Sequence, residues 1–452
     1  MARDTIVDRF LKQGEKHPNR PAIWYNVDRT WKNYTWADYV NGARNFAGAL
    51  LKVGFQTGGC TVIMGNNSPE WLIADVGTMV AAGSPAGIYQ TSTKEQAHYI
   101  AGHCEATVWV IEDLAMFNAM ELQGSWDALP HLKKVVMIRE ADLVERENVV
   151  GFQEFLDSGA NNQAAVDKSI AAIEPDALAT LIYTSGTTGP PKGVMLSHEN
   201  LAFTAAQAVE RIISVEPDDC VVSYLPLSHI AEQMFSLHLP ITGGCPVWCC
   251  DDMSKVKDTM VIARPTIFLA VPRVWEKFKS ALEGRFRAVT GAKAKIAEWA
   301  QGVCLEAGRI TFEKGADAIP FGLKLQFAAA EKLFASKLRA ALGLDRLRVA
   351  VTGAAPISKD VLEFFLSCGI PIHEVYGQSE GSGPGRFFDH VNADIERMNE
   401  KVARYEGIKK FALLHRDFSV EAGELTPTQK IKRKVVTTNY AEIIEGFYDG
   451  LD

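Results

Sequence analysis

The sequence lacks the features that mark membrane-spanning, secreted and nucleic-acid-binding proteins. No apolar run approaches the roughly 20 residues that a membrane-spanning helix needs, and residues 1–20 lack the apolar core of a signal peptide. Basic residues are not in excess, since 47 Lys and Arg accompany 55 Asp and Glu, for a net charge of −8. This balance argues against nucleic acid as a partner. We expect a cytoplasmic protein without a transmembrane segment, whose membrane contact, if any, is peripheral.

The eight cysteines form no metal-binding or disulfide pattern. None belongs to a C-x-x-C pair, and no histidines lie at zinc-finger spacing. Scattered cysteines in a long chain are typical of reduced, buried thiols. The cysteines therefore favour a reducing compartment and no structural metal site.

Helical and strand patterns alternate along most of the chain. Helical periodicity covers 36–53, an apolar run at 60–64 predicts a strand, and Ser68 with Pro69 opens a further helix. Ser197 is a good helix N-cap. Further strands are predicted at 107–112, 177–184, 193–196, 220–225, 245–250, 266–271, 347–352 and 371–376. This alternation predicts an α/β fold of parallel-rich sheets with flanking helices.

The chain length and one change of texture predict two domains. A long helical region rich in Lys, Glu and Ala is expected at about 273–342, and a break, GSGPGRFF, follows at 381–388. We predict a large N-terminal body, 1–385, and a small, shortened C-terminal lid, 386–452, which is marginal for an independent core. Within the lid we expect a charged helix at 392–405, a strand at 408–414 and a terminal helix that ends near Tyr448.

Residues 183–193, YTSGTTGPPKG, have the composition of a phosphate-binding loop. Gly186 and Gly189 let the backbone bend towards a ligand, and successive N–H groups in such a turn form an anion-binding concavity. Lys192 adds a mobile positive charge. It follows two prolines and precedes a strand, so this is not a Walker loop. By composition alone, a flexible surface loop stays open as an alternative.

The complete string resembles the signature of adenylate-forming enzymes, a family that includes acyl-CoA synthetases, luciferases and peptide-synthetase adenylation domains. Further segments resemble motifs of the same family in the same order: YLPLSHIAEQ at 224–233, VTGAAPIS at 351–358, VYGQSEGSG at 375–383 and PTQKIKRKVV at 427–436. With NNSPEWLIADVG at 66–77, these motifs are most similar to long-chain acyl-CoA synthetases of the bubblegum type.

The resemblance implies a role for each matching residue. The ATP phosphates would be held by Thr184, Ser185, Gly186, Thr187, Thr188, Gly189 and Lys192, and the adenine by Gly353, Ala354, Ala355, Tyr376, Gly377, Gln378 and Ser379. Glu380 and Thr184 would bind Mg²⁺, an ion that prefers oxygen ligands. Glu380, Thr184 and Lys430 would form the catalytic set, in which Lys430 stabilises the negative charge that develops as pyrophosphate leaves. Its neighbours Lys432, Arg433 and Lys434 stay open as alternatives.

The resemblance also implies the substrates. His229 would line the acyl site and position the substrate, although a single histidine is more often structural. The implied enzyme is an AMP-forming acid–thiol ligase that uses ATP, Mg²⁺ and CoA. It converts a long-chain fatty acid to an acyl adenylate and then to acyl-CoA.

The chain departs from the family pattern between its last two motifs. It has no Thr-Gly-Asp for the ribose and no Gly-Arg-x-Lys hinge, and GSGPG leads directly into a segment that resembles the far C-terminal region. A deletion, a joined sequence and a non-catalytic nucleotide- or acyl-binding relative all stay open. A serine hydrolase is disfavoured, because the GxSxG match at 377–381 around Ser379 continues into glycines that cannot start the required helix.

Overall fold

The computed structural model describes residues 3–124, 128–184, 190–375, 377, 433–441 and 443. The chain divides into two compact units, Met1–Pro384 and Gly385–Asp452. In the second unit, the described residues form helix α18 (Arg433–Asn439). The helix and strand predicted at 392–405 and 408–414 lie outside the described residues.

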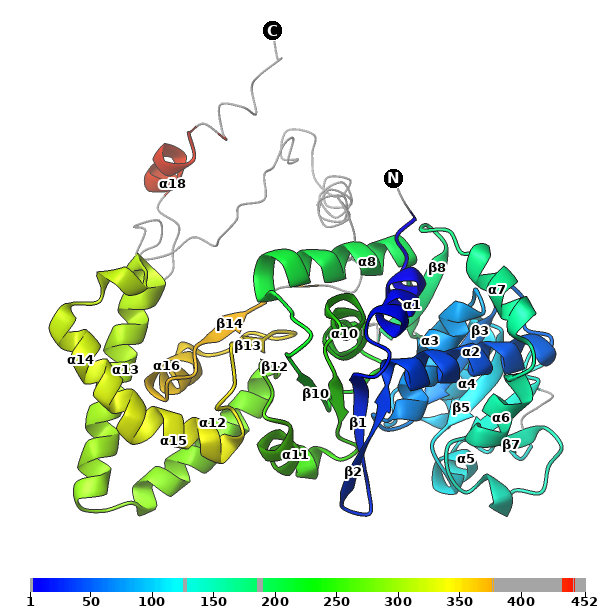
Figure 1. The fold of residues 1–452 in the computed structure, drawn as a ribbon, viewed down its shortest axis with the longest axis horizontal. Helices are drawn as coiled ribbons and strands as arrows, with labels where there is room; N and C mark the ends of the chain where they lie inside the picture. The colour runs from blue at the N-terminus through cyan, green and yellow to red at the C-terminus, as the bar shows by residue number, and fades with distance from the viewer. Residues whose placement is uncertain are drawn as a thin grey trace, which may run out of the picture. The chain divides into compact units, whose positions relative to one another are not determined.

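A seven-stranded sheet forms one half of the first unit (Figure 1). Its strands, in spatial order, are β7 (Val149–Gly151), β6 (Lys134–Met137), β5 (Ala106–Ile111), β3 (Cys60–Met64), β4 (Ser84–Gly87), β8 (Leu178–Thr184) and β9 (Lys192–Ser197). All neighbouring pairs are parallel except β8 and β9, which form an antiparallel hairpin. The predicted strands at 60–64, 107–112, 177–184 and 193–196 are confirmed.

Helices accompany this sheet. They are α2 (Trp36–Lys52), α3 (Pro69–Val80), α4 (Lys94–His103), α5 (Leu114–Ala119), α6 (Phe152–Gly159), α7 (Gln163–Ala171) and α8 (His198–Gln207), with α1 (Ile6–Lys16) packed on α2. Of these helices, α3 to α7 lie in the connections between the parallel strands of the sheet. The predicted starts are confirmed: Ser68 caps α3 and Ser197 caps α8. Helix α3 is buried along nearly its whole length, which places it between layers rather than at the surface.

A four-stranded sheet has the order β10-β11-β1-β2. Its strands are β1 (Pro21–Val27), β2 (Thr30–Thr35), β10 (Val221–Ser223) and β11 (Val247–Cys249). The β1–β2 hairpin was not predicted. Its turn residues, Asp28 and Arg29, both have positive φ, at +49° and +65°. The usual sequence signal of a tight hairpin turn with two such residues is Asn-Gly or Asp-Gly, and this turn has neither.

A third sheet is parallel and has the order β12 (Ile267–Leu269), β13 (Val349–Thr352) and β14 (Ile372–Glu374). Between its first two strands lies the helical region predicted at 273–342. It is confirmed as α12 (Pro272–Ala288), α13 (Ala292–Lys314), α14 (Phe321–Ala330) and α15 (Ser336–Leu342). Helix α16 (Lys359–Ser367) connects β13 to β14, and α11 (Val256–Ala263) lies between β11 and β12. None of the described helices is both long and apolar enough to cross a membrane.

Candidate nucleotide and acyl site

The loop predicted to bind phosphate joins the two strands of the β8–β9 hairpin. Thr184 ends β8, Lys192 begins β9, and the two residues are direct partners in the antiparallel register. Partners of this kind project from the same face of a sheet, so the hydroxyl and the ammonium stand together at the mouth of the loop. Lys192 is exposed and Thr184 is half-buried. The loop itself, 185–189, lies outside the described residues, so the roles of Ser185, Gly186, Thr187, Thr188 and Gly189 stay predictions.

Tyr183 anchors the strand that leads into this loop. Its side chain is buried, and its hydroxyl lies 2.7 Å from Nδ1 of His103, at the end of α4. A Cβ at Gly193 would lie 3.2 Å from the tyrosine ring. Any larger residue at this position would therefore require the ring of Tyr183 to move slightly. Burial raises the pKa of Tyr183, which therefore keeps its proton at neutral pH. The end of β8, from which the loop leaves, is thus fixed from the α4 side.

The segment predicted to face adenine leaves the carboxyl end of β13. Strands β13 and β14 are parallel neighbours, so Gly353 and Gly377 follow the sheet at the same edge. Ligands of open α/β sheets bind at such carboxyl edges. A Cβ at Gly353 would lie 2.9 Å from the carbonyl oxygen of Val375, and the backbone of Ala354 is left-handed at φ +66°. Both features make a tight turn that brings backbone close to the next strand.

Ala354 and Ala355 are exposed at this turn, as a flat ring against the backbone would require. The residues that would complete the pocket, Tyr376, Gln378, Ser379 and Glu380, lie outside the described part of the chain, as does Lys430.

His229 lies after β10, at the start of the short helix α9 (Ile230–Gln233). Its Nδ1 accepts a hydrogen bond from the N–H of Ala231 at 3.1 Å, so the imidazole caps the helix. Burial lowers its pKa, which keeps the ring neutral at pH 7. A neutral capping imidazole suits the predicted positioning role better than acid–base chemistry.

Glu232, on the same helix, is a functional candidate that the sequence analysis missed. Its side chain is fully buried, and burial raises its pKa to about 7. One carboxylate oxygen, Oε1, accepts hydrogen bonds from the N–H of Tyr224 at 3.1 Å and from Oγ of Ser236 at 2.6 Å. The available signal was the single carboxylate in the short helix that follows YLPLSH.

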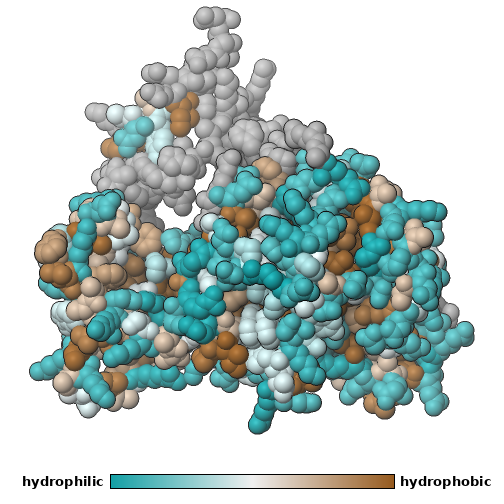
Figure 2. Space-filling model, viewed as in Figure 1, coloured by the Kyte–Doolittle hydropathy of each residue, from teal (hydrophilic) through white to brown (hydrophobic). Residues whose placement is uncertain are grey.

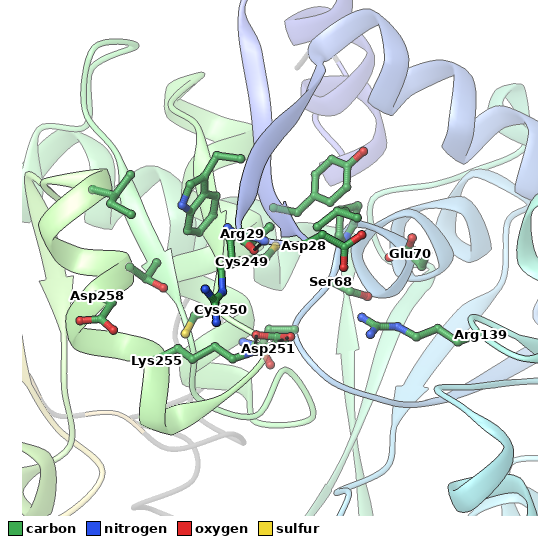
Figure 3. Close-up of a pocket in the computed structure, with 18 residues that line it drawn as sticks. Asp28, Arg29, Ser68, Glu70, Arg139, Cys249, Cys250, Asp251, Lys255 and Asp258 are labelled. Atoms are coloured by element: carbon green, nitrogen blue, oxygen red, sulfur yellow. Dashed lines mark hydrogen bonds and ion pairs between the residues drawn. The ribbon is translucent and has the colours of Figure 1, made fainter.

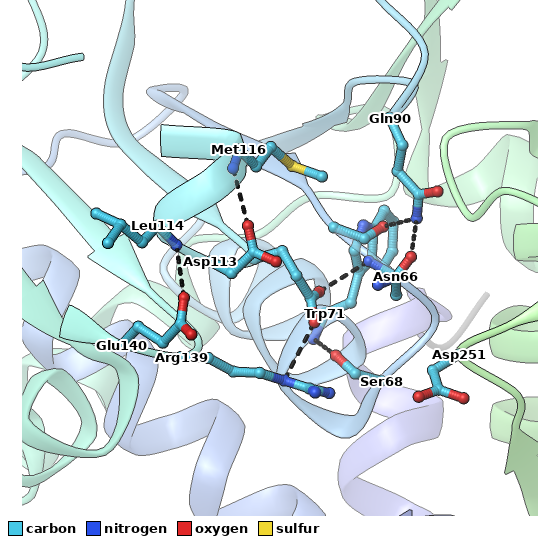
Figure 4. Close-up of polar contacts among 12 residues, drawn as sticks. Asn66, Ser68, Trp71, Gln90, Asp113, Leu114, Met116, Arg139, Glu140 and Asp251 are labelled. Carbon is cyan, nitrogen blue, oxygen red and sulfur yellow. Dashed lines mark hydrogen bonds and ion pairs between the residues drawn. The ribbon is translucent and has the colours of Figure 1, made fainter. Parts of the chain in front are cut away.

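A second buried carboxylate fixes the loop between β3 and α3 (Figure 4). Oε2 of Glu112 accepts a hydrogen bond from the N–H of Asn66 at 2.9 Å, and Arg139 pairs with Oε1 at 3.2 Å. Gln90 donates to the carbonyl of Gly65 and to Oδ1 of Asn66, at 2.7 and 2.8 Å. These contacts hold the NNSPEW segment, which the sequence analysis had used only as a resemblance.

A cleft of about 1020 Å³ opens beside this loop (Figure 3). Basic side chains from Arg29, Arg139 and Lys255 line it together with the acidic side chains of Asp28, Glu70, Asp251 and Asp258. Because both signs are present, the cleft offers no strong charge selection for a polyphosphate. Among the residues that the structure describes, none of the predicted site residues lines this cleft.

The described residues contain no cluster of three or more His, Cys, Asp or Glu side chains suited to a metal ion. Thr184 offers one hydroxyl oxygen, a ligand type that Mg²⁺ accepts. All eight cysteines lie in the described part of the chain and are free thiols, as their spacing predicts.

Comparison with known proteins agrees with the fold and the motifs. The sequence profile of the AMP-binding enzyme family matches residues 10–405. The chain is 40% identical over 387 residues to the long-chain-fatty-acid–CoA ligase ACSBG2 of Xenopus laevis, covering 84% of this chain and 51% of the relative. It is 35% identical over 388 residues to the human long-chain-fatty-acid–CoA ligase ACSBG1, covering 84% and 52%. The chain thus spans about half the length of the curated relatives it matches.

Solved structures support the same fold. A long-chain-fatty-acid-CoA ligase from Archaeoglobus fulgidus aligns with a TM-score of 0.60 at 18% identity, covering 84% of this chain and 65% of that one. The anthranilate CoA ligase AuaEII in complex with anthranoyl-AMP aligns with a TM-score of 0.61 at 18% identity, covering 84% and 61%. The predicted resemblance to adenylate-forming enzymes, nearest to the bubblegum type, is confirmed. The chain belongs to the AMP-binding enzyme family.

Proposed function

We propose that this chain is an AMP-forming ligase that activates a long-chain fatty acid with ATP and transfers it to CoA. The observation that carries the proposal is the β8–β9 hairpin, which pairs Thr184 with Lys192 on one face at the ends of a glycine- and hydroxyl-rich loop. The names of the curated relatives support the acid, since both are long-chain-fatty-acid–CoA ligases.

The proposed reaction has two steps. A carboxylate oxygen of the fatty acid attacks the α-phosphorus of ATP, and pyrophosphate leaves. The thiol of CoA then attacks the carbonyl carbon of the acyl adenylate, and AMP leaves. Lys192 and the loop residues would bind the phosphates, while Lys430 would stabilise the charge that develops in the first step. Mg²⁺ held by Thr184 and Glu380 would neutralise phosphate charge.

The adenine would lie against Gly353, Ala354 and Ala355. The exposed turn after β13 supports this assignment, as does the matching motif that starts at Val375. His229 would position the acyl substrate as a neutral group.

We also propose a cytoplasmic location with peripheral membrane contact. The eight free cysteines suit a reducing compartment. Phe321 and Leu325 of α14 are 77% and 60% exposed, and Figure 2 shows apolar surface at the α14 end of the first unit. Exposed apolar side chains of this size suit contact with a lipid surface, where long-chain fatty acids reside.

A pyrophosphate-exchange assay across fatty acids of increasing chain length tests the proposal. The expected result is ATP–pyrophosphate exchange that depends on a long-chain acid, followed by acyl-CoA when CoA is added. Lys430→Ala should lower the exchange rate at least about 100-fold, because the lysine acts on the transition state. Lys432→Ala is the matched control and should keep the wild-type rate. Undiminished exchange in Lys430→Ala would remove that residue from the mechanism.

A second candidate is a relative that binds nucleotide or acyl groups without catalysis. It is favoured by the missing Thr-Gly-Asp. ATP at a hundredfold excess over its Kd would then stabilise the folded chain by about 2.7 kcal/mol and so raise its melting temperature. No acid would support pyrophosphate exchange. The serine hydrolase stays disfavoured. Labelling of Ser379 by a fluorophosphonate probe would revive it.

A further inference from the structure

The segment 224–229, between β10 and α9, is held from one side by a line of buried polar side chains. Asn67, in the β3–α3 loop, donates from Nδ2 to the carbonyl of Leu225 and to Oγ of Ser223, both at 2.8 Å. Ser223 in turn donates to Oε1 of Glu232 at 2.8 Å. Glu232 accepts from the N–H of Tyr224 through the same oxygen. These contacts connect Asn67 and Glu232 to Ser223, Tyr224 and Leu225, at and just before the start of this segment.

The far end of the segment packs closely against the seven-stranded sheet. Gly87 ends β4, and a Cβ there would lie 2.6 Å from Cα of Ser228. Side-chain-free backbone of the seven-stranded sheet therefore packs directly against the residue before His229. The segment is fixed at both ends to the sheet that also carries the phosphate loop.

Stability alone does not account for a fully buried carboxyl group at this position. Burying Glu232 costs free energy, and an apolar side chain of similar volume would be cheaper to bury. The carboxyl group supplies what an apolar side chain lacks, which is a fixed acceptor for Ser223 and Tyr224. Its partners thus gain a defined position rather than a stronger core.

We propose that Asn67, Ser223 and Glu232 are positioning residues that hold the 224–229 segment, with His229, in a fixed place against the seven-stranded sheet and so determine affinity for the fatty acid. This inference rests on the proposed function. A fatty acid must present its carboxylate to the α-phosphorus, and small misplacements of a positioning segment are costly for such an alignment.

The test uses four variants of the full chain and two affinities. Asn67→Ala and Glu232→Leu should weaken binding of a fluorescent long-chain fatty acid about tenfold and leave the Kd of ATP within about twofold. Glu232→Gln retains the accepting oxygen and should stay within about threefold of wild type for both ligands. Thr78→Val removes a buried hydroxyl that donates to Ala74 within α3, and it controls for the general loss of a buried hydrogen bond. It should change neither affinity.

Hydrogen–deuterium exchange of peptides covering 224–229 gives a readout that does not need activity. Exchange should speed up about tenfold or more in Asn67→Ala and Glu232→Leu, and stay as in wild type in Glu232→Gln and Thr78→Val. Asn67→Ala removes a single side chain at the rim of the cluster, so it reports even if Glu232→Leu fails to fold. Unchanged exchange in Asn67→Ala, or equal losses of fatty-acid and ATP affinity, would overturn the inference.

Pyrophosphate exchange is measured in parallel and judges the proposed function separately. A wild-type chain that binds the fatty acid but supports no exchange refutes the ligase and leaves the positioning role supported or refuted by the binding data. A wild-type chain that binds no fatty acid overturns the role in acyl affinity.

Discussion

Burial decides the protonation of the ionisable side chains near the candidate site. Glu232 and His229 are neighbours on one short helix, yet burial acts on them in opposite senses. It raises the pKa of the acid and lowers that of the imidazole, because a low-dielectric environment disfavours charge of either sign. At pH 6 and below Glu232 is therefore mostly protonated, and at neutral pH the imidazole of His229 is uncharged.

Glu232 should make stability depend on pH in a defined window. Its pKa rises from an ordinary 4.5 to about 7 in the folded chain, so between these values the folded protein binds the proton and the unfolded chain does not. The stabilisation is complete below pH 4.5 and is lost as the pH rises through 7, by roughly 3 kcal/mol in total.

Urea unfolding of the wild type and Glu232→Gln at pH 5, 6, 7 and 8 measures this dependence. The wild type should lose free energy of unfolding relative to the variant as the pH rises, since glutamine does not titrate. A difference that stays constant from pH 5 to 8 would show that Glu232 is ionised in the folded chain throughout.

At the scale of elements, two glycines allow α2 and α6 to touch backbone to backbone. A Cβ at Gly48 would overlap the carbonyl oxygen of Gly159, and a Cβ at Gly159 would overlap the carbonyl oxygen of Asn45 and the nitrogen of Ala49. Neither glycine has a positive φ, so space and not backbone conformation demands them. The layer of helices on the seven-stranded sheet depends on this crossing.

Gly159→Ala should therefore destabilise the chain by about 3 kcal/mol or more, because backbone atoms cannot move aside as a flexible side chain can. Gly302→Ala is the matched control. Gly302 lies within α13 with nothing near its would-be Cβ, and alanine there should be neutral or stabilise by up to about 1 kcal/mol. Urea unfolding of both variants tests the contrast. Equal stabilities would mean that α2 and α6 can separate without cost.

At the scale of the whole first unit, long-range polar contacts tie the sheets together. Arg348, just before β13, donates through Nε to Oδ1 of Asp219 at 2.9 Å and through a second nitrogen to Oδ2. Asp219 is buried and precedes β10, so the pair joins the three-stranded and four-stranded sheets. Burial alone would raise the pKa of Asp219, but hydrogen bonds from Arg348 and from the N–H of Glu216 lower it overall.

Removing Arg348 should leave a buried carboxylate unpaired. We expect Arg348→Met to lower the free energy of unfolding by about 1–3 kcal/mol at pH 7, less than for a fully buried pair because the arginine is 42% exposed. Since the pKa of Asp219 is lowered, the loss should shrink as the pH falls below about 4. Arg346→Met, which loses only an exposed contact to the carbonyl of Asp218, is the control. Equal effects of the two substitutions would refute the tie between the sheets.

The sequence by itself determined the local elements and the family. Periodicity and capping residues such as Ser68 and Ser197 act over a few residues, so the strands at 60–64 and 177–184 and the helices that follow could be predicted. The motifs are continuous strings, and the resemblance that they carry needed no coordinates. The hairpin with Asp28 and Arg29 at its turn was not predicted, because both residues have positive φ and the turn lacks the glycine that usually signals this conformation.

Only the tertiary structure decided what meets across the chain. The approach of Gly87 to Ser228 and the hydrogen bond from Asn67 to Leu225 join residues that no local pattern connects. The burial that shifts Glu232 likewise comes from packed neighbours, because the free energy of a charge depends on the surrounding dielectric and not on adjacent sequence. The sequence therefore indicated the family of this chain, and the packing of the folded chain determined which side chains hold the 224–229 segment.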